Sequence, residues 1–300
     1  MTATAITASH LVKSYASKIA VNDLSFTLAK GEILGLIGPN GSGKTTTIRM
    51  LLDIIKPDSG SVLILGDKLQ ESTKQKIGYL PEERGLYKKL SVMDSILYLA
   101  SLKGMDRNAA EARATTLLSQ TGLLAHQRKK TEELSKGMGQ LVQFIISILH
   151  DPELLIFDEP FSGLDPVNTE LLKGMVHELR QQGKAIILST HQMNQVEELC
   201  DRMLMIYQGR AVHYGSIPEI KARYRNNTVI LEADNIPAEI AGVRERRPGN
   251  GYIELVLDPA TTPQQLLAEL VRQGASIRRF EIALPSLNEI FLRTVGHESE

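Results

Sequence analysis

Gly38-Pro39-Asn40-Gly41-Ser42-Gly43-Lys44-Thr45 decides the fold of this chain, because it matches the pattern G-x-x-x-x-G-K-[ST] without a gap. The apolar run Ile33–Ile37 before it predicts a buried strand, and Thr46–Leu52 after it predicts a helix. Glycines let such a loop curl so that consecutive backbone N–H groups point at phosphate oxygens, and the following helix adds the positive end of its dipole. We expect Lys44 to reach the β- and γ-phosphates of a nucleotide and the Thr45 hydroxyl to bind Mg²⁺. A chance glycine-rich turn before a helix is the alternative, and the motifs further along the chain argue against it.

Two acidic residues end a second apolar strand, Leu154–Phe157. Asp158 would hold Mg²⁺ together with Thr45, and Glu159 would polarise the attacking water. A solvated strand end is the alternative interpretation, and the phosphate loop earlier in the chain makes it the weaker one.

Three further positions carry both a functional and a structural interpretation. His191 follows a buried strand at 184–189, and its place at a strand's carboxyl end, where open α/β sheets bind ligands, favours function over a structural role. Tyr15 is either an adenine-stacking face or a half-buried strand residue. Ser135 opens a helix, which it can cap, or it can join Gly137 in presenting N–H groups to a phosphate.

Composition and charge narrow the classes of function. The chain has 300 residues, of which 42% are hydrophobic and 23% charged, and its formal net charge is -1. The lack of a dominant Lys/Arg run and the low aromatic content (5%, without Trp) argue against nucleic acid as a partner. The longest apolar run, at 141–149, is shorter than the ~20 residues that a membrane span needs, and Met1–His10 lacks the features of a signal peptide. The lone Cys200 excludes an internal disulfide and fits a reducing compartment.

The order of predicted elements indicates an α/β fold followed by a smaller module. Alternating apolar and polar residues at 5–30 predict antiparallel strands beside the phosphate loop, and 61–65 and 76–80 predict further strands. Apolar residues at helical spacing predict helices at 92–122 and again to about residue 150, which indicates an inserted helical subdomain at about 85–150. A hairpin around Gln208-Gly209 closes this part of the chain.

After the polar segment Tyr224-Arg225-Asn226-Asn227 the pattern changes. Strands at 229–231, 252–257 and 276–282 and helices at 263–273 and 286–294 predict a small α+β module. The predicted domains are therefore 1–224 and 225–300. The module shows no cluster of titratable residues in its sequence, which favours an interaction or regulatory role.

The order of these motifs resembles the ATP-binding cassette (ABC) family over about Leu11–Gly215. Gly38–Thr45 is similar to the Walker A loop of that family, and Asp158 and Glu159 are similar to its Walker B aspartate and catalytic glutamate. The segment Leu134–Met138 resembles the signature motif. Tyr15 resembles the aromatic residue of the family's A-loop. Ser162–Asp165 resembles its D-loop, and His191 resembles its switch histidine.

The resemblance implies a fold, a reaction and a dimer. The fold would be a P-loop NTPase core with antiparallel β and helical subdomains, and the reaction would be hydrolysis of ATP with Mg²⁺ as cofactor. Two copies would pair head to tail, so that each ATP lies between the Walker A loop of one copy and the signature of the other. Catalytic roles would fall to Glu159, His191 and Lys44, and metal binding to Thr45, Asp158 and Glu82. Nucleotide contacts would come from Tyr15, Gly38, Pro39, Asn40, Gly41, Ser42, Gly43, Lys44, Thr45, Thr46, Glu82, Ser135, Gly137 and Asp165.

This sequence departs from the family pattern at two places. After Tyr79-Leu80-Pro81 the family usually has glutamine, whereas Glu82 keeps an oxygen for Mg²⁺ or water but adds negative charge near a phosphate. Lys136 and Met138 replace the second Gly and the Gln of the usual Leu-Ser-Gly-Gly-Gln, and Met138 cannot make the polar contact of Gln. Both departures resemble the export subgroup of sodium- and drug-efflux ATP-binding subunits, which carry a small C-terminal extension. The end of this chain, 285–291, resembles the terminal helix of that extension.

The subgroup implies a separate, multi-span, ABC-2-like permease as partner, and a cytoplasmic location on the inner face of the cell membrane. A soluble ABC ATPase that acts as an assembly or ribosome-associated factor is the alternative. Such factors with two cassettes are disfavoured because the chain has one Walker A motif, and coiled-coil types are disfavoured by the lack of long heptads. A non-catalytic binding module is disfavoured by the intact Asp158, Glu159 and His191.

Overall fold

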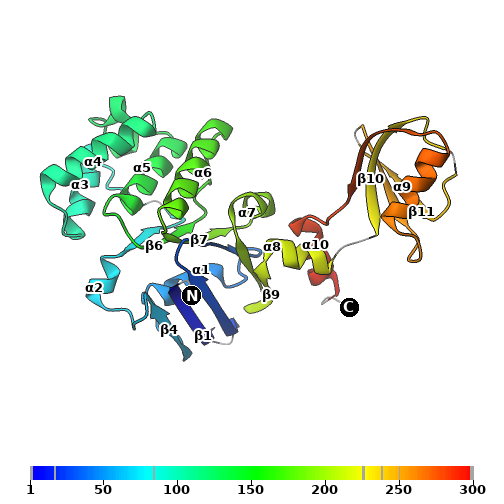
Figure 1. The fold of residues 1–300 in the computed structure, drawn as a ribbon. Helices are drawn as coiled ribbons and strands as arrows, with labels where there is room; N and C mark the ends of the chain where they lie inside the picture. The colour runs from blue at the N-terminus through cyan, green and yellow to red at the C-terminus, as the bar shows by residue number, and fades with distance from the viewer. Residues whose placement is uncertain are drawn as a thin grey trace. The chain divides into compact units, whose positions relative to one another are not determined.

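The computed structural model describes residues 3–16, 18–83, 85–224, 227–237, 239–249 and 251–297. The chain divides into two compact units, Met1–Ile217 and Pro218–Glu300 (Figure 1). The predicted boundary at residue 224 falls inside the second unit. Of the segment that suggested this boundary, Arg225 and Asn226 lie outside the described residues.

A six-stranded sheet in the order β5-β6-β7-β3-β8-β9 forms the centre of the first unit. Its neighbouring strands run parallel, except for β8 and β9, which pair antiparallel. The strands β3, β6 and β7 are buried along their whole length, which explains why their sequences read as continuous apolar runs. Because these three strands are parallel neighbours, the phosphate loop, the Asp158-Glu159 pair and His191 all follow them at one edge of the sheet. The six strands are β3 (Ile33–Ile37), β5 (Ile77–Leu80), β6 (Leu154–Asp158), β7 (Ala185–Thr190), β8 (Arg202–Tyr207) and β9 (Arg210–Ser216).

A three-stranded antiparallel sheet in the order β2-β1-β4 shares a core with one face of the central sheet. Helix α1 (Lys44–Leu51) belongs to the same core, in which Leu24, Ile48 and Ile156 are fully buried. The antiparallel strands that alternation predicted at 5–30 are confirmed. The strands of this sheet are β1 (Thr4–Tyr15), β2 (Lys18–Ala29) and β4 (Ser59–Ile64).

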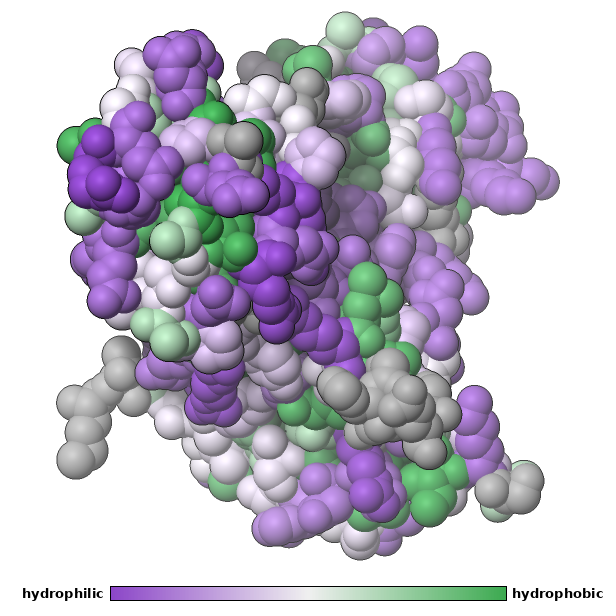
Figure 2. Space-filling view, turned by 90° about the vertical axis from the view of Figure 1, so that its right-hand side faces the viewer, coloured by the Kyte–Doolittle hydropathy of each residue, from purple (hydrophilic) through white to green (hydrophobic). Residues whose placement is uncertain are grey.

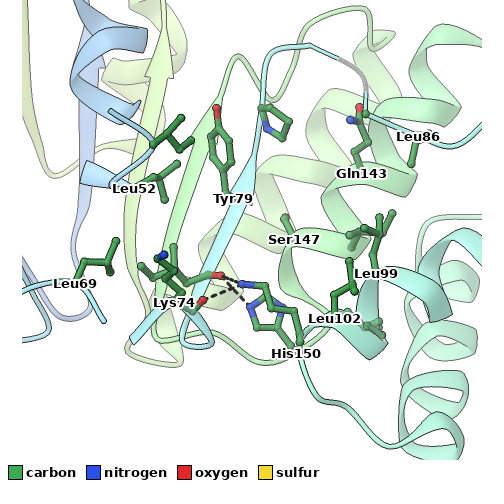
Figure 3. Close-up of a pocket in the computed structure, with 18 residues that line it drawn as sticks. Leu52, Leu69, Lys74, Tyr79, Leu86, Leu99, Leu102, Gln143, Ser147 and His150 are labelled. Carbon is green, nitrogen blue, oxygen red and sulfur yellow. Dashed lines mark hydrogen bonds between the residues drawn. The ribbon is translucent and has the colours of Figure 1, made fainter. Parts of the chain in front are cut away.

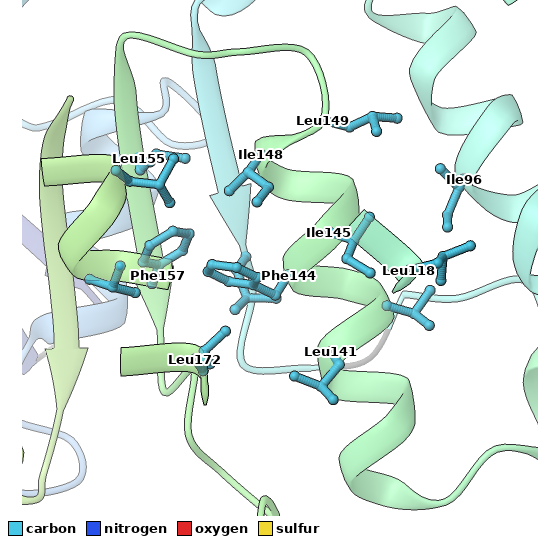
Figure 4. Packing of buried hydrophobic residues seen from close by; sticks show 14 of the residues in the cluster. Ile96, Leu118, Leu141, Phe144, Ile145, Ile148, Leu149, Leu155, Phe157 and Leu172 are labelled. Atoms are coloured by element: carbon cyan, nitrogen blue, oxygen red, sulfur yellow. The ribbon is translucent and has the colours of Figure 1, made fainter. Parts of the chain in front are cut away.

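Helices cover the opposite face of the central sheet. Helix α5 packs on the sheet through Phe144, whose ring centroid lies 5.2 Å from that of Phe157 on β6 (Figure 4). Ile96, Leu118 and Leu172 join the same cluster from three other helices. The helices predicted at 92–122 and to about residue 150 are confirmed. Their bounds are α3 (Val92–Leu102), α4 (Arg107–Gln120), α5 (Lys136–Ile148) and α6 (Pro166–Gln181), with short 3₁₀ turns at Leu124–His126 and Thr131–Glu133.

Short polar residues set where these helices begin. The side chains of Ser91, Asp106, Ser135 and Asp165 each accept a hydrogen bond from a backbone N–H in the first turn of the helix that follows. Such caps satisfy N–H groups that have no partner inside the helix. The positions of α3 to α6 are therefore encoded locally, before packing refines them.

The second unit contains a four-stranded antiparallel sheet in the order β11-β12-β10-β13. Helix α9 (Pro263–Arg272) begins with a capping box formed by Thr262 and Gln265, and it contributes Leu266 and Leu270 to the core of this unit. The strands and helices predicted for this part of the chain are confirmed, whereas β11 was missed. Its other elements are β10 (Thr228–Asp234), β11 (Val243–Pro248), β12 (Ile253–Leu257), β13 (Ser276–Ile282) and α10 (Leu287–His297), and α8 (Ile217–Arg223) spans the division between the units.

Two other short helices complete the first unit, α2 (Glu71–Lys74) and α7 (Met193–Leu199). Among the helices in the described ranges, none combines the length and the apolar character that a bilayer crossing requires. On the face of the molecule that Figure 2 shows, hydrophilic side chains predominate and hydrophobic ones form smaller areas. This distribution fits a chain whose large apolar side chains lie mainly in its cores.

Candidate functional site

The phosphate loop, Gly38–Thr45, joins β3 to α1 in a conformation that requires glycine at two positions. Gly38 has a φ of 151° and Gly43 a φ of 116°. A Cβ on Gly38 would lie 2.1 Å from the carbonyl oxygen of Ile206, and one on Gly43 would lie 2.5 Å from that of Ala20. Because Gly43 is the N-cap of α1 and has no side chain, it cannot satisfy the N–H groups of the first turn itself. Those N–H groups can therefore bind a phosphate.

Lys44 is buried and its ammonium group lies over the loop. Its Nζ donates hydrogen bonds to the carbonyl oxygens of Gly38 (2.7 Å) and Pro39 (3.1 Å). Burial lowers the pKa of Lys44, and the charges of Glu159, Asp158 and Glu82 oppose that shift. A bound phosphate would therefore offer this ammonium group a charged oxygen in place of two neutral carbonyl oxygens.

A pocket of about 390 Å³ brings together most of the predicted site residues. Its size lies within the usual range for small-molecule sites. Pro39 and Ser42 line an adjoining hollow of about 350 Å³, which shares Asn40 and Gly41 with the pocket. The pocket itself is lined by Tyr15, Lys18, Ala20, Asn40, Gly41, Gly43, Lys44, Thr45, Thr46, Glu82, Asp158 and Glu159.

Glu159 is fixed by the residues that follow β7. Its Oε1 accepts a hydrogen bond from the backbone N–H of His191 (3.0 Å) and lies 2.7 Å from Nδ1 of the same residue. Its Oε2 accepts a hydrogen bond from the hydroxyl of Thr190 (3.2 Å). The carboxylate is thus oriented at the wall of the pocket, as a general base must be. His191, predicted to contact the γ-phosphate, contacts Glu159 in this structure.

Asp158 has the features that a magnesium ligand needs. The residue is 1% exposed, and its Oδ2 finds no hydrogen-bond donor in the described part of the chain. Burial raises the pKa of Asp158, and the nearby charges of Glu82 and Glu159 add to the shift. A buried carboxylate oxygen without a donor is costly unless a cation or another donor meets it. Among the described residues, no three or more His, Cys, Asp or Glu side chains form a group that could hold a metal ion.

Glu82 and Tyr15 reach the pocket from two other elements. Glu82 follows β5, and its charge acts on both Lys44 and Asp158. Tyr15 ends β1, is 47% exposed, and has the Nζ of Lys13 at 5.8 Å from its ring centroid. An exposed ring at the rim of a pocket can stack on a base, which leaves the adenine interpretation in place.

Ser135, Gly137 and Asp165 are not among the residues that line this pocket. Ser135 and Asp165 instead cap α5 and α6, which was the structural alternative for Ser135. Gly137 lies close to the D-loop. A Cβ added to Gly137 would lie 3.2 Å from the carbonyl oxygen of Gly163. In one copy of the chain the signature segment therefore does not contribute to the pocket that its own phosphate loop forms.

Sequence reasoning missed two residues beside Glu159. Thr190 holds its carboxylate, and Gln140 on α5 donates its amide to the carbonyl oxygens of Pro160 (3.0 Å) and Glu159 (3.4 Å). Gln140 is 2% exposed. A polar residue on an otherwise apolar helix face was the available signal, but its partners could not be read from the sequence.

Comparisons with known proteins match two parts of the chain to family models. The family model described as "ABC transporter" matches residues 21–162. A second model, "ATP-binding protein DrrA1-3-like, C-terminal domain", matches residues 215–295. The first match lies within the first compact unit, and the second covers most of the second unit.

Individual relatives cover nearly the whole chain. The chain is 40% identical to an "Uncharacterized ABC transporter ATP-binding protein" of Bacillus subtilis, over 97% of this chain and 98% of the relative. It is 34% identical to the "Nod factor export ATP-binding protein I" of Rhizobium sp., over the full length of both. A solved structure titled "Structure of ATP binding subunit of ABC transporter" is 30% identical and superposes with a TM-score of 0.69, over 73% of this chain and 93% of that one.

Proposed function

This chain belongs to the ABC transporter family, and from that premise we propose that it is the ATP-hydrolysing subunit of an export system, driving a separate membrane permease. The observation that carries the proposal is the pocket in which the phosphate loop, Asp158 and Glu159 converge. ATP hydrolysis is the activity of the family. Export is supported by the C-terminal match to the DrrA1-3-like model and by the relative named for Nod factor export.

The residues of the pocket have distinct roles in the proposed reaction. Glu159 accepts a proton from water, whose oxygen attacks the γ-phosphorus while the bond to the ADP oxygen breaks. Lys44 and the N–H groups of the loop stabilise the charge that develops on the phosphoryl oxygens. His191 orients the Glu159 carboxylate, to which it is hydrogen-bonded.

Thr45 and Asp158 would hold Mg²⁺, with Glu82 close enough to contribute an oxygen or a bridging water. The ion, when bound, neutralises charge on the β- and γ-phosphates. The fit rests on the buried Oδ2 of Asp158, which lacks a donor in the described residues.

A second copy of the chain completes the site in this proposal. Ser135, Gly137 and Asp165 lie outside the pocket of their own copy, although the family resemblance assigns them to nucleotide contact. A head-to-tail homodimer would bring these residues of one copy to the phosphate loop of the other. Closure of the pair on ATP and opening after hydrolysis would supply the motion that the permease uses.

We assign the permease contact to a second cavity of about 420 Å³, which we call the groove (Figure 3). It lies between β5, the loop after β5, and helices α3 and α5, and its walls are mainly apolar. Two of its apolar residues are exposed, Ile54 (58%) and Leu102 (59%). An exposed apolar surface of this kind marks a protein or membrane contact.

The groove adjoins the nucleotide pocket through the chain itself. Pro81 lines the groove, and the next residue, Glu82, lines the nucleotide pocket. Tyr79 also lines the groove, and its pKa is raised to about 12, mainly by burial and further by the charge of Asp158. A partner bound in the groove would therefore contact the segment that carries Glu82. This supports Glu82 as the residue through which the presence of nucleotide in the pocket is transmitted to the permease. The chain would then lie peripherally on the inner face of the cell membrane.

Calorimetric titration with ATP and Mg²⁺ tests the nucleotide half of the proposal. We expect Lys44→Ala to weaken ATP binding on the order of 100-fold, because it removes a charge-assisted contact to the phosphates. Lys56→Ala is the matched control, since Lys56 is exposed and pairs with Asp53 away from the pocket. Unchanged affinity in Lys44→Ala would contradict the assignment of the phosphate loop.

Purification from native membranes tests the transport half. We expect the full chain to bring down a protein with several apolar spans of ~20 residues each. Recovery in the ribosomal or soluble fraction alone would favour an assembly factor instead.

A further inference from the structure

Two segments of the first unit that are far apart in the sequence run side by side at its surface. Residues 87–93 lead into α3, and residues 127–131 follow α4. The backbone N–H of Val92 donates a hydrogen bond to the carbonyl oxygen of Lys129 (2.9 Å), and further backbone hydrogen bonds and an antiparallel bridge join the same segments. Side chains from both segments therefore form one surface.

This pairing collects five basic side chains, which we call the basic strip. All five are exposed, and none forms an ion pair within the described part of the chain. The two segments contain no acidic residue, although the net charge of the whole chain is -1. Because the strip is assembled from two short runs, neither run is prominent in the sequence. The members of the basic strip are Lys88, Lys89, Arg128, Lys129 and Lys130.

A pair of aromatic rings and a hollow adjoin the strip. The rings of Tyr87 and Tyr98 meet edge to face with their centroids 5.3 Å apart, and the two residues are 49% and 44% exposed. Tyr98 also lines a hollow of about 330 Å³ between α3 and α4, which lie side by side (Figure 1). Leu97 and Met105 give the hollow apolar walls, and Arg107 adds an exposed cation without an ion-pair partner in the described ranges.

Three acidic residues directly follow the two paired segments, and two of them are engaged by neighbouring donors. Asp94, which also lines the hollow, accepts a hydrogen bond at Oδ2 from the hydroxyl of Ser91 (2.5 Å). Oε2 of Glu133 accepts one from the backbone N–H of Lys130 (2.7 Å). Glu132 is exposed. The cations of the strip outnumber these carboxylates, so the surface that they share is positively charged.

The basic strip lies next to the groove that we assign to the permease. Leu86 and Leu99 line the groove, and their neighbours in the sequence are Tyr87 and Tyr98. A permease held in a bilayer would therefore keep this part of the chain close to the lipid surface.

We propose that the basic strip and the tyrosine pair bind anionic lipid headgroups directly, at the inner face of the membrane; the choice of this face rests on the proposed function. Ammonium and guanidinium groups bind phosphate oxygens, and each basic residue near an anionic membrane strengthens binding by about fivefold. Tyrosine is enriched at membrane–water interfaces, because its ring is apolar and its hydroxyl is polar. An acidic protein would use the cations alone, whereas a bilayer uses the cations, the exposed rings and the apolar hollow together.

Vesicle flotation with the purified full chain tests this contact. The probe is vesicles of phosphatidylcholine with about 30% phosphatidylglycerol, and vesicles of phosphatidylcholine alone are the reference. We expect binding to the anionic vesicles alone, and release when NaCl rises from about 0.1 M to about 0.5 M, because salt screens exposed charges.

A double substitution within the strip locates the contact. Lys88→Gln combined with Lys89→Gln should weaken binding to the anionic vesicles by about 30-fold, which is about fivefold for each charge. Lys56→Gln combined with Lys68→Gln is the matched control, because it removes the same charge from exposed positions outside the strip. This control should retain binding.

Fluorescence shows whether the tyrosine pair enters the interface. The chain has no tryptophan, so Tyr98→Trp introduces a single reporter. We expect its emission to move to shorter wavelength on anionic vesicles and to be quenched by lipids with brominated acyl chains, because the ring leaves water. Leu267→Trp, at a comparably exposed position of the second unit (37%), should show neither change.

The outcomes separate this inference from the proposed function. Absence of binding to anionic vesicles, equal loss in both lysine pairs, or an unchanged Tyr98→Trp spectrum on bound protein overturns the lipid contact. Equal binding of polyglutamate and of anionic vesicles, without the spectral change, overturns it in favour of an acidic protein. The Lys88 and Lys89 variant should release phosphate from ATP at the wild-type rate, because neither residue lines the nucleotide pocket. Lack of ATP hydrolysis by the unmodified chain would overturn the proposed function and leave vesicle binding as it is.

Discussion

Glu159 combines a left-handed backbone conformation with hydrogen bonds to both its backbone and its side chain. Its φ of 51° lies in the left-handed region, which costs a residue with a Cβ about 1–2 kcal/mol. The backbone N–H of Glu159 donates to Ser189 (2.9 Å), while Thr190 and His191 hold its side chain. Strain of this kind persists where the surrounding structure imposes it, and it commonly occurs at functional sites.

Glu159→Gln should stop hydrolysis while leaving nucleotide binding intact. The amide has the same shape as the carboxylate but cannot take a proton from water, so we expect phosphate release to fall by about 10²- to 10⁴-fold. ATP-bound dimers should accumulate and be visible by size-exclusion chromatography. Glu153→Gln, which alters a surface carboxylate paired with Lys30 and Lys76, is the control. Undiminished phosphate release from Glu159→Gln would remove this residue from the role of base.

His150 makes the stability of the first unit depend on pH. Its pKa is about 4 in the fold against an ordinary value of 6.5, because burial disfavours the charged ring. The unfolded chain therefore binds the proton more readily, so this contribution to stability is present above pH 6.5 and is lost as the pH falls towards 4. After allowance for partial exposure we expect His150→Gln to lose about 1–2 kcal/mol less than the wild type between pH 7.5 and pH 4.5.

Chemical denaturation of both proteins at the two pH values measures this difference. Other carboxylates titrate in the same range, and the comparison between the two proteins cancels them. Equal losses in both would show that burial of His150 does not affect its protonation.

At the residue scale, the sequence predicted the positions whose chemistry is local. Lys44, Asp158 and Glu159 were identifiable because a loop or strand pattern places them, and the structure brings them into one pocket. The contacts of Gln140 and Thr190 with the Glu159 segment were not predictable, since they join α5 and β7 to it across the fold. Such contacts depend on packing between elements, which no local pattern encodes.

At the element scale, α5 connects the signature segment to the end of β6. Ser135 caps this helix, Gly137 lies close to Gly163 of the D-loop, and Gln140 donates to the carbonyl oxygens of Glu159 and Pro160. A displacement of the N-terminal end of α5 would therefore reach the backbone of the proposed base. We infer that Gln140 positions Glu159 and does not itself touch the nucleotide.

Gln140→Leu should lower kcat without changing KM. Loss of the two hydrogen bonds frees the backbone of Glu159, and a small misplacement of a base costs roughly 10- to 100-fold in rate. Steady-state phosphate release over a range of ATP concentrations gives both constants, with thermal unfolding to confirm that the variant is folded. Gln120→Leu, at the exposed end of α4, is the matched control. A raised KM with normal kcat would indicate a role in binding instead.

The elements that sequence reasoning missed have weak local signals. Strand β11 lies at the edge of its sheet and carries three exposed charged residues, Arg244, Glu245 and Arg247. Charged side chains are common on edge strands, where they discourage pairing with another chain. Helix α2 is a single turn without buried residues. By contrast, strands β3, β6 and β7 are buried throughout and consist mainly of apolar residues, and helices α3 to α6 begin after Ser or Asp residues that cap them.

At the scale of the whole molecule, the separation of the signature segment from the phosphate loop has a direct consequence. If a second copy supplies Ser135 to each pocket, then Lys44 and Ser135 of one chain belong to different sites of the dimer, and in a mixed dimer the Lys44 defect of one copy meets the Ser135 defect of the other. One site of that dimer would carry both defects and the other would carry none. A site contained within one copy could not be restored in this way.

Mixing Lys44→Ala with Ser135→Asp should therefore recover activity that neither variant has alone. Ser135→Asp keeps a good helix cap on α5 but sets a negative charge against the phosphate, so the fold is retained while the site is lost. With random pairing half of the dimers are mixed and each has one intact site, so phosphate release should reach about a quarter of the wild-type rate if the sites act independently. Ser135→Asn, which caps without the charge, should retain activity and shows that the effect is electrostatic. An inactive mixture in which mixed dimers are verified by differential tagging would place the complete site within a single copy of the chain.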